Sequence, residues 1–370
     1  MKKRFLFWAL LLLLACPLHS NAQSIEPQVN ENVELMSILS RLAGFSEYRM
    51  DIDFFHENLA GEYTGDINKY FEKQSKHLAV KYMKMLRLIN NIGYDAIMSM
   101  ALHLQNRDGK LYYVDSELKE LDSRWDRVNK KRFLSLLNKF YQDSDFDVFF
   151  KEHQKFYAKG LNACRENMIK YFDQAWYSNF YGKQSQERYS VIIGFNNGAG
   201  NYGPCRQIKG ENKEVFAILG YCENKEGIPL YDKSDLSTLI HEFNHSFINY
   251  LLDEKQFPDH VKDLEHPASV LYESCKSEME QQAYGDWKTL INESLVRAAV
   301  ICYMMDNENF STEEVEEATS EQIESGFRWM PELVSLLREY EGQRNEYPDF
   351  ESFYPRVINF FTEYVENVTE

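Results

Sequence analysis

A pair of histidines within an apolar segment constrains this chain more than any other feature of its sequence. Residues 236–252 would be apolar on nearly every side of a helix, which predicts a helix buried in the core. His241 and His245 lie within this segment four residues apart, so their imidazoles share one face and can bind one metal ion. Glu242 follows His241, and an ionised buried glutamate without a partner costs several kcal/mol. These three polar side chains therefore need partners inside the fold.

The string from His241 to His245 fits the HExxH pattern, in which two histidines hold zinc and the glutamate acts as a general base. A zinc ion would satisfy both imidazoles and would give Glu242 a water molecule to deprotonate. We therefore expect Zn²⁺ as the cofactor, His241 and His245 as its ligands, and Glu242 as the catalytic residue. The structural alternative is a hydrogen-bonded pair of histidines in the core, without a metal.

A catalytic zinc ion usually has three protein ligands and leaves one position to water. The best candidate for the third ligand is Glu293, which lies in a second apolar helix expected over residues 287–305. Arg297 lies one helical turn after Glu293, and an ion pair between them would need no metal. The remaining candidates lie in a segment interrupted by two prolines and are more typical of surface groups: His260, His266 and Glu273.

The two apolar helices are similar to those of gluzincin peptidases, which combine HExxH on one helix with a glutamate on another. The strings His241-Glu242-Phe243-Asn244-His245 and Glu293-Ser294-Leu295-Val296-Arg297 resemble a bacterial family known as DUF4932, a domain of unknown function. The similarity extends across most of the chain after residue 22. It implies that His241, His245 and Glu293 bind zinc and that Glu242 is catalytic. The gap between the second histidine and Glu293 is longer than in thermolysin-like enzymes.

The expected function is hydrolysis of a peptide or protein substrate by a zinc-bound water molecule, with Glu242 as the proton acceptor. A strand expected at residues 190–195, with the glycine-rich loop to Gly203, could hold an extended peptide by edge pairing, as the gluzincin resemblance implies. Tyr284 and Tyr303 are candidate donors to the oxyanion. The alternative from another class is a non-catalytic secreted binding protein, in which structural zinc or a polar cluster only stabilises the core.

The N-terminus predicts export to the periplasm or the extracellular space. A positively charged start precedes an uncharged apolar run at residues 5–15, which is too short to span a bilayer comfortably. Residues 20–22 offer a small-x-small cleavage site, so residues 1–22 are expected to be a signal peptide. The alternative is a lipoprotein anchored at Cys16, because residues 13–16 resemble a lipobox. No later apolar run is long enough for an integral membrane segment after cleavage.

Charge and cysteine content exclude two classes of site. The formal net charge is -17, which makes nucleic acid an unexpected partner. The cysteines after residue 22 show no CxxC spacing, so a cysteine zinc site has no support. Cys205 and Cys222 flank a candidate hairpin, where they would either form a disulfide or remain buried thiols.

Apolar periodicity predicts an α+β, predominantly helical fold. We expect a gluzincin-like core, with a small β-sheet next to the HExxH helix and helices flanking it on both sides in sequence. The expected regions are a helical N-terminal region at 23–185, a zinc-site catalytic region at 186–305 and a C-terminal helical region at 306–370. Strands are predicted at 189–195 and 214–221, and helices at 35–42, 67–78, 80–104, 131–141, 146–172, 232–252, 287–305 and 331–340, with a capping box at 311–314.

Overall fold

The computed structural model describes residues 25–49, 61–182, 187–198, 200–224, 226–282 and 284–369. Over these residues the chain forms fifteen α-helices and six short strands, which confirms the α+β, predominantly helical class. The expected signal peptide at residues 1–22 and the alternative anchor at Cys16 lie outside the described residues. Within the described ranges, no helix is both long and apolar enough to cross a membrane.

The helices extend along the whole chain. Their bounds are α1 (Glu31–Leu42), α2 (Gly61–Tyr70), α3 (Leu78–Asn90), α4 (Asp95–Leu102), α5 (Lys130–Asp143), α6 (Phe146–Glu152), α7 (Gln154–Asn167), α8 (Ala175–Tyr181), α9 (Leu236–Ile248), α10 (Pro258–Ser274), α11 (Lys276–Gln281), α12 (Trp287–Asp306), α13 (Thr312–Glu324), α14 (Met330–Gly342) and α15 (Phe350–Thr369).

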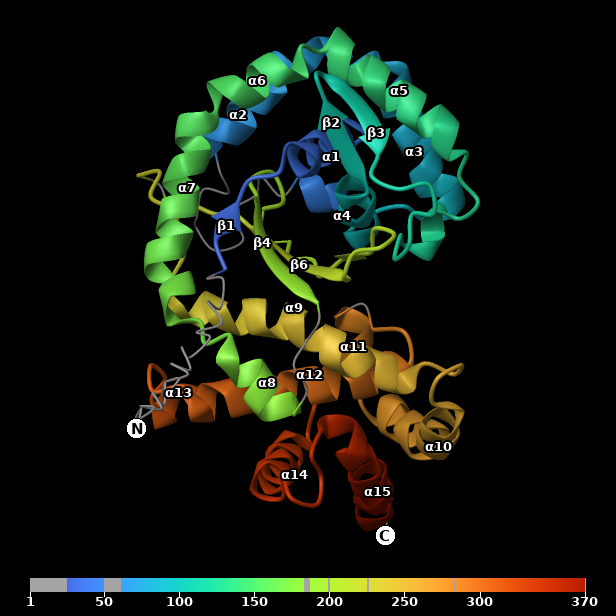
Figure 1. Cartoon of the computed structure of the whole chain (residues 1–370), viewed down its shortest axis with the longest axis vertical. Helices are drawn as coiled ribbons and strands as arrows, with labels where there is room; N and C mark the ends of the chain where they lie inside the picture. The colour runs from blue at the N-terminus through green and yellow to red at the C-terminus, as the bar shows by residue number, and fades with distance from the viewer. Residues whose placement is uncertain are drawn as a thin grey trace, which may run out of the picture.

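A four-stranded sheet lies at the centre of the molecule in the order β1-β4-β6-β5 (Figure 1). Strands β1 (Pro27–Gln28) and β6 (Glu214–Gly220) both run parallel to β4 (Arg188–Gly194), and β5 (Cys205–Arg206) runs antiparallel to β6. Most of β4 and β6 is buried, as their runs of apolar residues require. The two predicted strands are therefore confirmed, whereas β1 and β5 are too short to leave a period in the sequence.

Helices cover the sheet on opposite sides (Figure 1). Helices α2, α5, α6 and α7 form an arch around the sheet, with α1 and α4 packed against each other inside it. On the other side, α9 lies between the sheet and the C-terminal helices and contacts both β6 and α12. Helix α12 is the centre of the C-terminal layer, because α10, α13 and α14 all pack against it. The HExxH helix is thus the element that joins the two parts of the fold.

One predicted helix is wrong. Residues 80–104 were expected to form a single helix, but α3 ends at Asn90, and the C-cap Asn91 takes a left-handed conformation with φ of 53°. Helix α4 follows, and the chain then forms an antiparallel hairpin of β2 (Leu104–Arg107) and β3 (Lys110–Tyr113). The hairpin turn is Asp108-Gly109, with φ of 51° and 78°. An Asp-Gly pair between two short runs is a hairpin signal that the apolar periodicity obscured.

Other helix boundaries shift by smaller amounts. The helix predicted at 67–78 is the end of α2 followed by a 3-10 turn, and the helix at 146–172 is divided into α6 and α7. The helix predicted at 232–252 is α9 with a 3-10 turn at each end. The predicted capping box is confirmed, since Ser311 caps α13 and Glu314 returns the hydrogen bond.

Cys205 carries a free thiol, so the alternative of a disulfide with Cys222 is wrong. The hairpin exists, but its geometry keeps the two cysteines apart. Cys205 pairs with Val215 near the start of β6, whereas Cys222 follows the end of that strand. A strand rises about 3.3 Å per residue, which places the two cysteines much further apart than a disulfide allows.

A buried carboxylate joins α1 to the end of β4. Glu34 has no exposed surface; its Oε1 accepts a hydrogen bond from the Phe195 backbone N–H (2.8 Å), and its Oε2 accepts one from the Tyr63 hydroxyl (2.7 Å). Burial raises the pKa of Glu34 to about 7, against the opposing effect of these two hydrogen bonds. Since Phe195 opens the loop that leads to Gly203, Glu34 fixes the start of that loop.

The raised pKa of Glu34 predicts a pH-dependent stability. In the unfolded chain this carboxyl ionises near its ordinary pKa of 4.5, and in the folded protein near 7. The stability that the protonated form contributes is therefore complete below pH 4.5 and is lost as the pH rises through 7. Relative to Glu34→Gln, which cannot ionise, the wild type should lose on the order of 3 kcal/mol of unfolding free energy over this interval. Urea denaturation of both proteins at several pH values measures the difference, and parallel curves would contradict the assignment.

Candidate metal centre

Helix α9 has two chemically different faces. Its apolar face is buried against β6 and against aromatic side chains of α8, where the Phe247 ring stacks on that of Tyr181 at 4.3 Å between centroids. Its polar face carries His241, Glu242 and His245, all of which are half-buried. The predicted helix is confirmed, but it is not apolar on nearly every side: one face is buried in the core, and the face that carries the motif borders a cavity.

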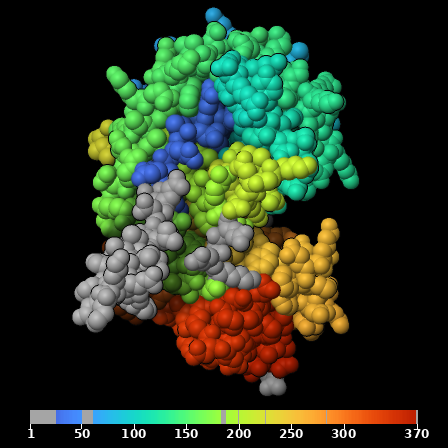
Figure 2. All heavy atoms as spheres, viewed as in Figure 1, coloured from blue at the N-terminus to red at the C-terminus, as the bar shows by residue number. Residues whose placement is uncertain are grey.

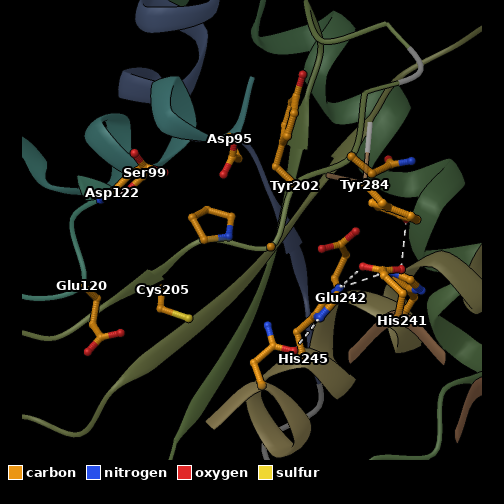
Figure 3. Close-up of a pocket in the computed structure, with 15 residues that line it drawn as sticks. Asp95, Ser99, Glu120, Asp122, Tyr202, Cys205, His241, Glu242, His245 and Tyr284 are labelled. Carbon is orange, nitrogen blue, oxygen red and sulfur yellow. Dashed lines mark hydrogen bonds and ion pairs between the residues drawn. The ribbon is translucent and has the colours of Figure 1, made fainter. Parts of the chain in front are cut away.

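The three predicted ligands come together. The Nε2 atoms of His241 and His245 lie 3.2 Å apart, and the two Glu293 carboxylate oxygens each lie 3.5 Å from one of them (Figure 3). Tetrahedral zinc with ligand distances of about 2.0–2.1 Å places its ligand atoms about 3.3 Å from one another. These three side chains could therefore hold a metal ion as they stand. Among the described residues, they are the only group of three or more histidine, cysteine, aspartate or glutamate side chains with this property.

The packing of α9 on α12 brings Glu293 to the histidines, and Asn244 sets the register of the two helices. Asn244 is fully buried inside the HExxH motif; its Nδ2 donates to the Val296 carbonyl of α12 (3.4 Å) and its Oδ1 accepts from the Tyr181 hydroxyl (2.9 Å). Val296 lies less than one turn after Glu293. Sequence reasoning missed Asn244, because the x positions of HExxH carry no required residue type.

Two side chains orient the Glu293 carboxylate from behind. Its Oε2 accepts hydrogen bonds from the Tyr284 hydroxyl (3.0 Å) and from Arg297 Nε (3.3 Å), while Arg297 Nη2 also donates to the Tyr284 oxygen (2.9 Å). The ion pair between Glu293 and Arg297, which was the alternative to metal binding, therefore exists together with the three-ligand geometry. Arg297 Nη1 extends the network by donating to Gln322 Oε1 of α13 (2.6 Å).

The surroundings of His241 favour its neutral form, which is the form that binds a metal. Burial lowers the pKa of His241 well below its ordinary value, and the neighbouring His245 and Arg297 lower it further, so the imidazole is neutral. His245 Nδ1 lies 3.1 Å from Asn249 Oδ1, which can accept its proton and leave Nε2 facing the shared position. Asn249 lies one turn after His245, a spacing that sequence reasoning did not use.

Glu242 reaches into the cavity beside the ligands (Figure 3). Burial raises its pKa to about 7, and the Glu293 and Asp95 carboxylates contribute in the same direction against the effect of His245. The backbone of Gly203 lies close to this carboxylate, since a Cβ atom at that position would come within 2.3 Å of Glu242 Oε2. A side chain at the end of the glycine-rich loop would therefore displace the Glu242 carboxylate from its present position.

The candidate site opens onto a cavity of about 470 Å³. Asp95, Glu120 and Asp122 lie across it from the histidines, and residues 201–205 border it between the two groups (Figure 3). In the space-filling view the surface is indented at its right edge, between the teal and yellow-green part and the gold C-terminal part (Figure 2). Solvent and small ligands can therefore reach the three-ligand group.

The model of one protein family, described as a domain of unknown function (DUF4932), matches residues 25–360. The chain belongs to the DUF4932 family. The matched region includes the whole sheet and all residues of the candidate metal centre. No curated protein and no solved structure matches the chain.

The other residues of this DUF4932 protein that the sequence suggested as oxyanion donors or zinc ligands either lie outside the candidate metal centre or make other hydrogen bonds. Tyr303 is fully buried and does not border the cavity; its hydroxyl accepts from the Asp173 backbone N–H (2.6 Å) and donates to the Tyr171 carbonyl (3.4 Å), so it is not placed to donate to an oxyanion. Tyr284 borders the cavity, but its hydroxyl donates to Glu293. The alternative third ligands are outside the three-residue group: His260 Nδ1 lies 3.0 Å from the Leu251 carbonyl, Glu273 pairs with Lys276, and His266 is exposed.

The expected peptide-binding edge is also corrected. Strand β4 lies between β6, which pairs with it over its whole length, and β1, which pairs with Val191 and Ile192 in its middle. The segment that borders the cavity is 201–205, and from residue 202 it runs antiparallel to β6 through the Tyr202–Ile218 bridge and β5. Tyr202 and Pro204 hydrogen-bond to β6, so the N–H and C=O of the intervening Gly203 point away from the sheet.

The geometry of the site predicts that substitutions of Glu293 and of Arg297 change the zinc affinity by different amounts. Glu293→Gln removes an anionic ligand and should weaken zinc binding by about tenfold or more. Arg297→Ala leaves the carboxylate in place and removes only one of its donors, so the loss should be smaller. Zinc affinity is measured by competition with a chelating dye. Glu273→Gln, the same change at a solvent-exposed alternative candidate, is the matched control and should leave the affinity unchanged; equal affinities in all three variants would exclude Glu293 as a ligand.

Proposed function

We propose that this DUF4932 protein is an exported, zinc-dependent peptidase of the gluzincin type. The observation that carries the proposal is the mutual spacing of the His241, His245 and Glu293 ligand atoms at 3.2–3.5 Å, with Glu242 beside them in the same cavity. Three protein ligands and one open side are the arrangement of catalytic zinc. Two imidazoles and a carboxylate also form a ligand set that suits zinc.

When bound at these residues, zinc would polarise a substrate carbonyl and lower the pKa of a water molecule toward about 7. Glu242 would accept a proton from a water molecule as the water oxygen forms a bond to the substrate carbonyl carbon. The C–N bond then breaks, and Glu242 transfers the proton to the leaving amine. Its pKa of about 7 suits both steps, because it can hold and release a proton near neutral pH.

The cavity wall favours a peptide as the substrate. The backbone N–H and C=O of Gly203 point away from β6, beside the Glu242 carboxylate. An extended peptide that paired with this segment would add a strand to the sheet and bring its own carbonyl groups past the zinc position. A peptide could pair with only a short part of this edge. The Gln207 N–H, further along it, already donates to the Lys119 carbonyl.

The alternative is a binding protein in which a metal or a polar cluster only stabilises the helices. Structural zinc sites are usually closed by four protein ligands, whereas the group here has three, and the side chains of His241 and His245 are 20% and 23% exposed. A structural site also needs no base, yet Glu242 lies at the cavity with Gly203 against it. These observations favour catalysis.

Replacement of Glu242 tests the proposal. Glu242→Gln keeps the shape of the side chain and removes the base, so peptide hydrolysis should fall about a hundredfold or more while zinc content stays at one ion per chain. Hydrolysis is measured with an unstructured protein substrate and with fluorogenic peptides, and zinc by atomic emission. Glu273→Gln is the matched control and should retain both properties. Zinc binding without any Glu242-dependent hydrolysis would favour the binding protein.

A further inference from the structure

Helix α3 exposes an apolar surface to solvent. Four of its large apolar side chains are exposed: Leu78 (56%), Met85 (38%), Leu88 (86%) and Ile89 (71%). No other helix of the described residues exposes as many. Met85 lies seven positions after Leu78 and three or four before the other two, so the four side chains form one stripe along the helix. Isolated exposed apolar residues are normal on proteins, whereas contiguous ones indicate an interaction surface.

The fold itself does not use this stripe. The core side of α3 is formed by other residues, which are buried where the helix packs on α1 and α5: Ala79, Val80, Tyr82, Met83 and Leu86. In Figure 1, α3 lies beside α5 in the upper half of the molecule. Since the exposed side chains point away from these contacts, polar substitutions among them should leave the fold intact.

Lysine side chains are interspersed with the exposed apolar residues. Lys81 lies between Leu78 and Met85 on the helix surface, and Lys84 lies one turn before Leu88. Both lysines are exposed, and within the part of the chain that the structure describes neither forms an ion pair. The surface is therefore both apolar and positively charged.

The positive charge of this surface is local. Helix α3 contains no aspartate or glutamate, although the whole chain has 58 acidic and 41 basic residues. Glu47, which reaches the helix from outside, is already paired with Arg87 of α3 (2.7 Å). At physiological ionic strength, exposed charges are largely screened beyond about 8–10 Å. An anionic partner at α3 would therefore respond to the lysines more than to the net charge of -17.

We propose that α3 binds the protein to the surface of an anionic phospholipid membrane. Leu88 and Ile89 would enter the boundary between head groups and acyl chains, where leaving water is favourable. Lys81 and Lys84 would extend their ammonium groups to the lipid phosphates. The protein would then lie on the membrane without spanning it.

A lipid surface suits this face better than a second copy of the chain does. A symmetric dimer through α3 would place the lysines of one copy against the same lysines of the other, so the interface would bring like charges together. Leu88 and Ile89 also protrude into solvent, and a fluid lipid surface accepts protruding side chains without a matching pocket.

Co-sedimentation with vesicles tests the proposal. The mature protein, without its predicted signal peptide, is incubated with vesicles of phosphatidylcholine alone or of phosphatidylcholine and phosphatidylglycerol in equal parts. It should sediment with the mixed vesicles and not with phosphatidylcholine alone, and added salt should weaken binding. Ile89→Gln should weaken binding to the mixed vesicles about tenfold, and Lys84→Gln about fivefold.

The same two changes elsewhere on the surface are the matched controls. Ile228→Gln replaces an isoleucine that is 56% exposed in the loop between β6 and α9. Lys262→Gln removes an exposed lysine of α10, which lies in the lower half of Figure 1. Both controls should bind the mixed vesicles as the wild type does, and all four variants should keep its thermal unfolding temperature.

Two results would overturn the proposal. One is that the wild type does not bind the mixed vesicles, or that Ile89→Gln and Lys84→Gln bind them as tightly as the two controls. The other is that the protein forms a dimer in solution that Ile89→Gln dissociates, as measured by light scattering. That result would assign the surface to a second copy of the chain.

Discussion

The contact between α9 and α12 is the interaction on which the candidate site depends. Each helix carries only part of the metal group, and Glu293 reaches the two histidines because the helices pack in one register. A polar link inside an apolar interface fixes that register, since Asn244 is fully buried and bonds to the Val296 carbonyl. An interface of apolar side chains alone tolerates small shifts of one helix along the other. A shift that left the buried Asn244 amide without its hydrogen-bond partners would be destabilising. Asn244 therefore gives the interface a single favourable arrangement.

The electrostatics of the site follow from its position between two layers. Burial makes His241 neutral and raises the pKa of Glu242, and both effects come from the low polarity of the same packed core. Arg297 and Tyr284 donate hydrogen bonds to the Glu293 carboxylate from behind, which holds its oxygens toward the histidines. The network continues through Gln322 to α13.

The sequence predicted those parts of the molecule that local periodicity determines. The motif helix, the two main strands and α12 follow from apolar spacing within single segments, and Glu293 stood out as a carboxylate in an apolar helix. The contact of Asn244 with Val296 and the approach of Gly203 to Glu242 are long-range, so no spacing in the chain records them. Strand β4 has a neighbour on its second side because β1 pairs with it. This strand has only two residues and lies near the N-terminus, far from β4 in the sequence. The hairpin at Asp108-Gly109 was missed although its signal was present, because the apolar run before it was read as helix.

X-ray anomalous scattering at the zinc edge, from crystals of the protein grown with zinc, tests the central claim most directly. The account predicts one strong peak about 2 Å from the Nε2 atoms of His241 and His245 and from the Glu293 carboxylate, with solvent at the remaining position. The ligand atoms should move little from their present separations of 3.2–3.5 Å. A zinc peak elsewhere in the protein, or histidine rings turned away from each other around an empty position, would contradict it.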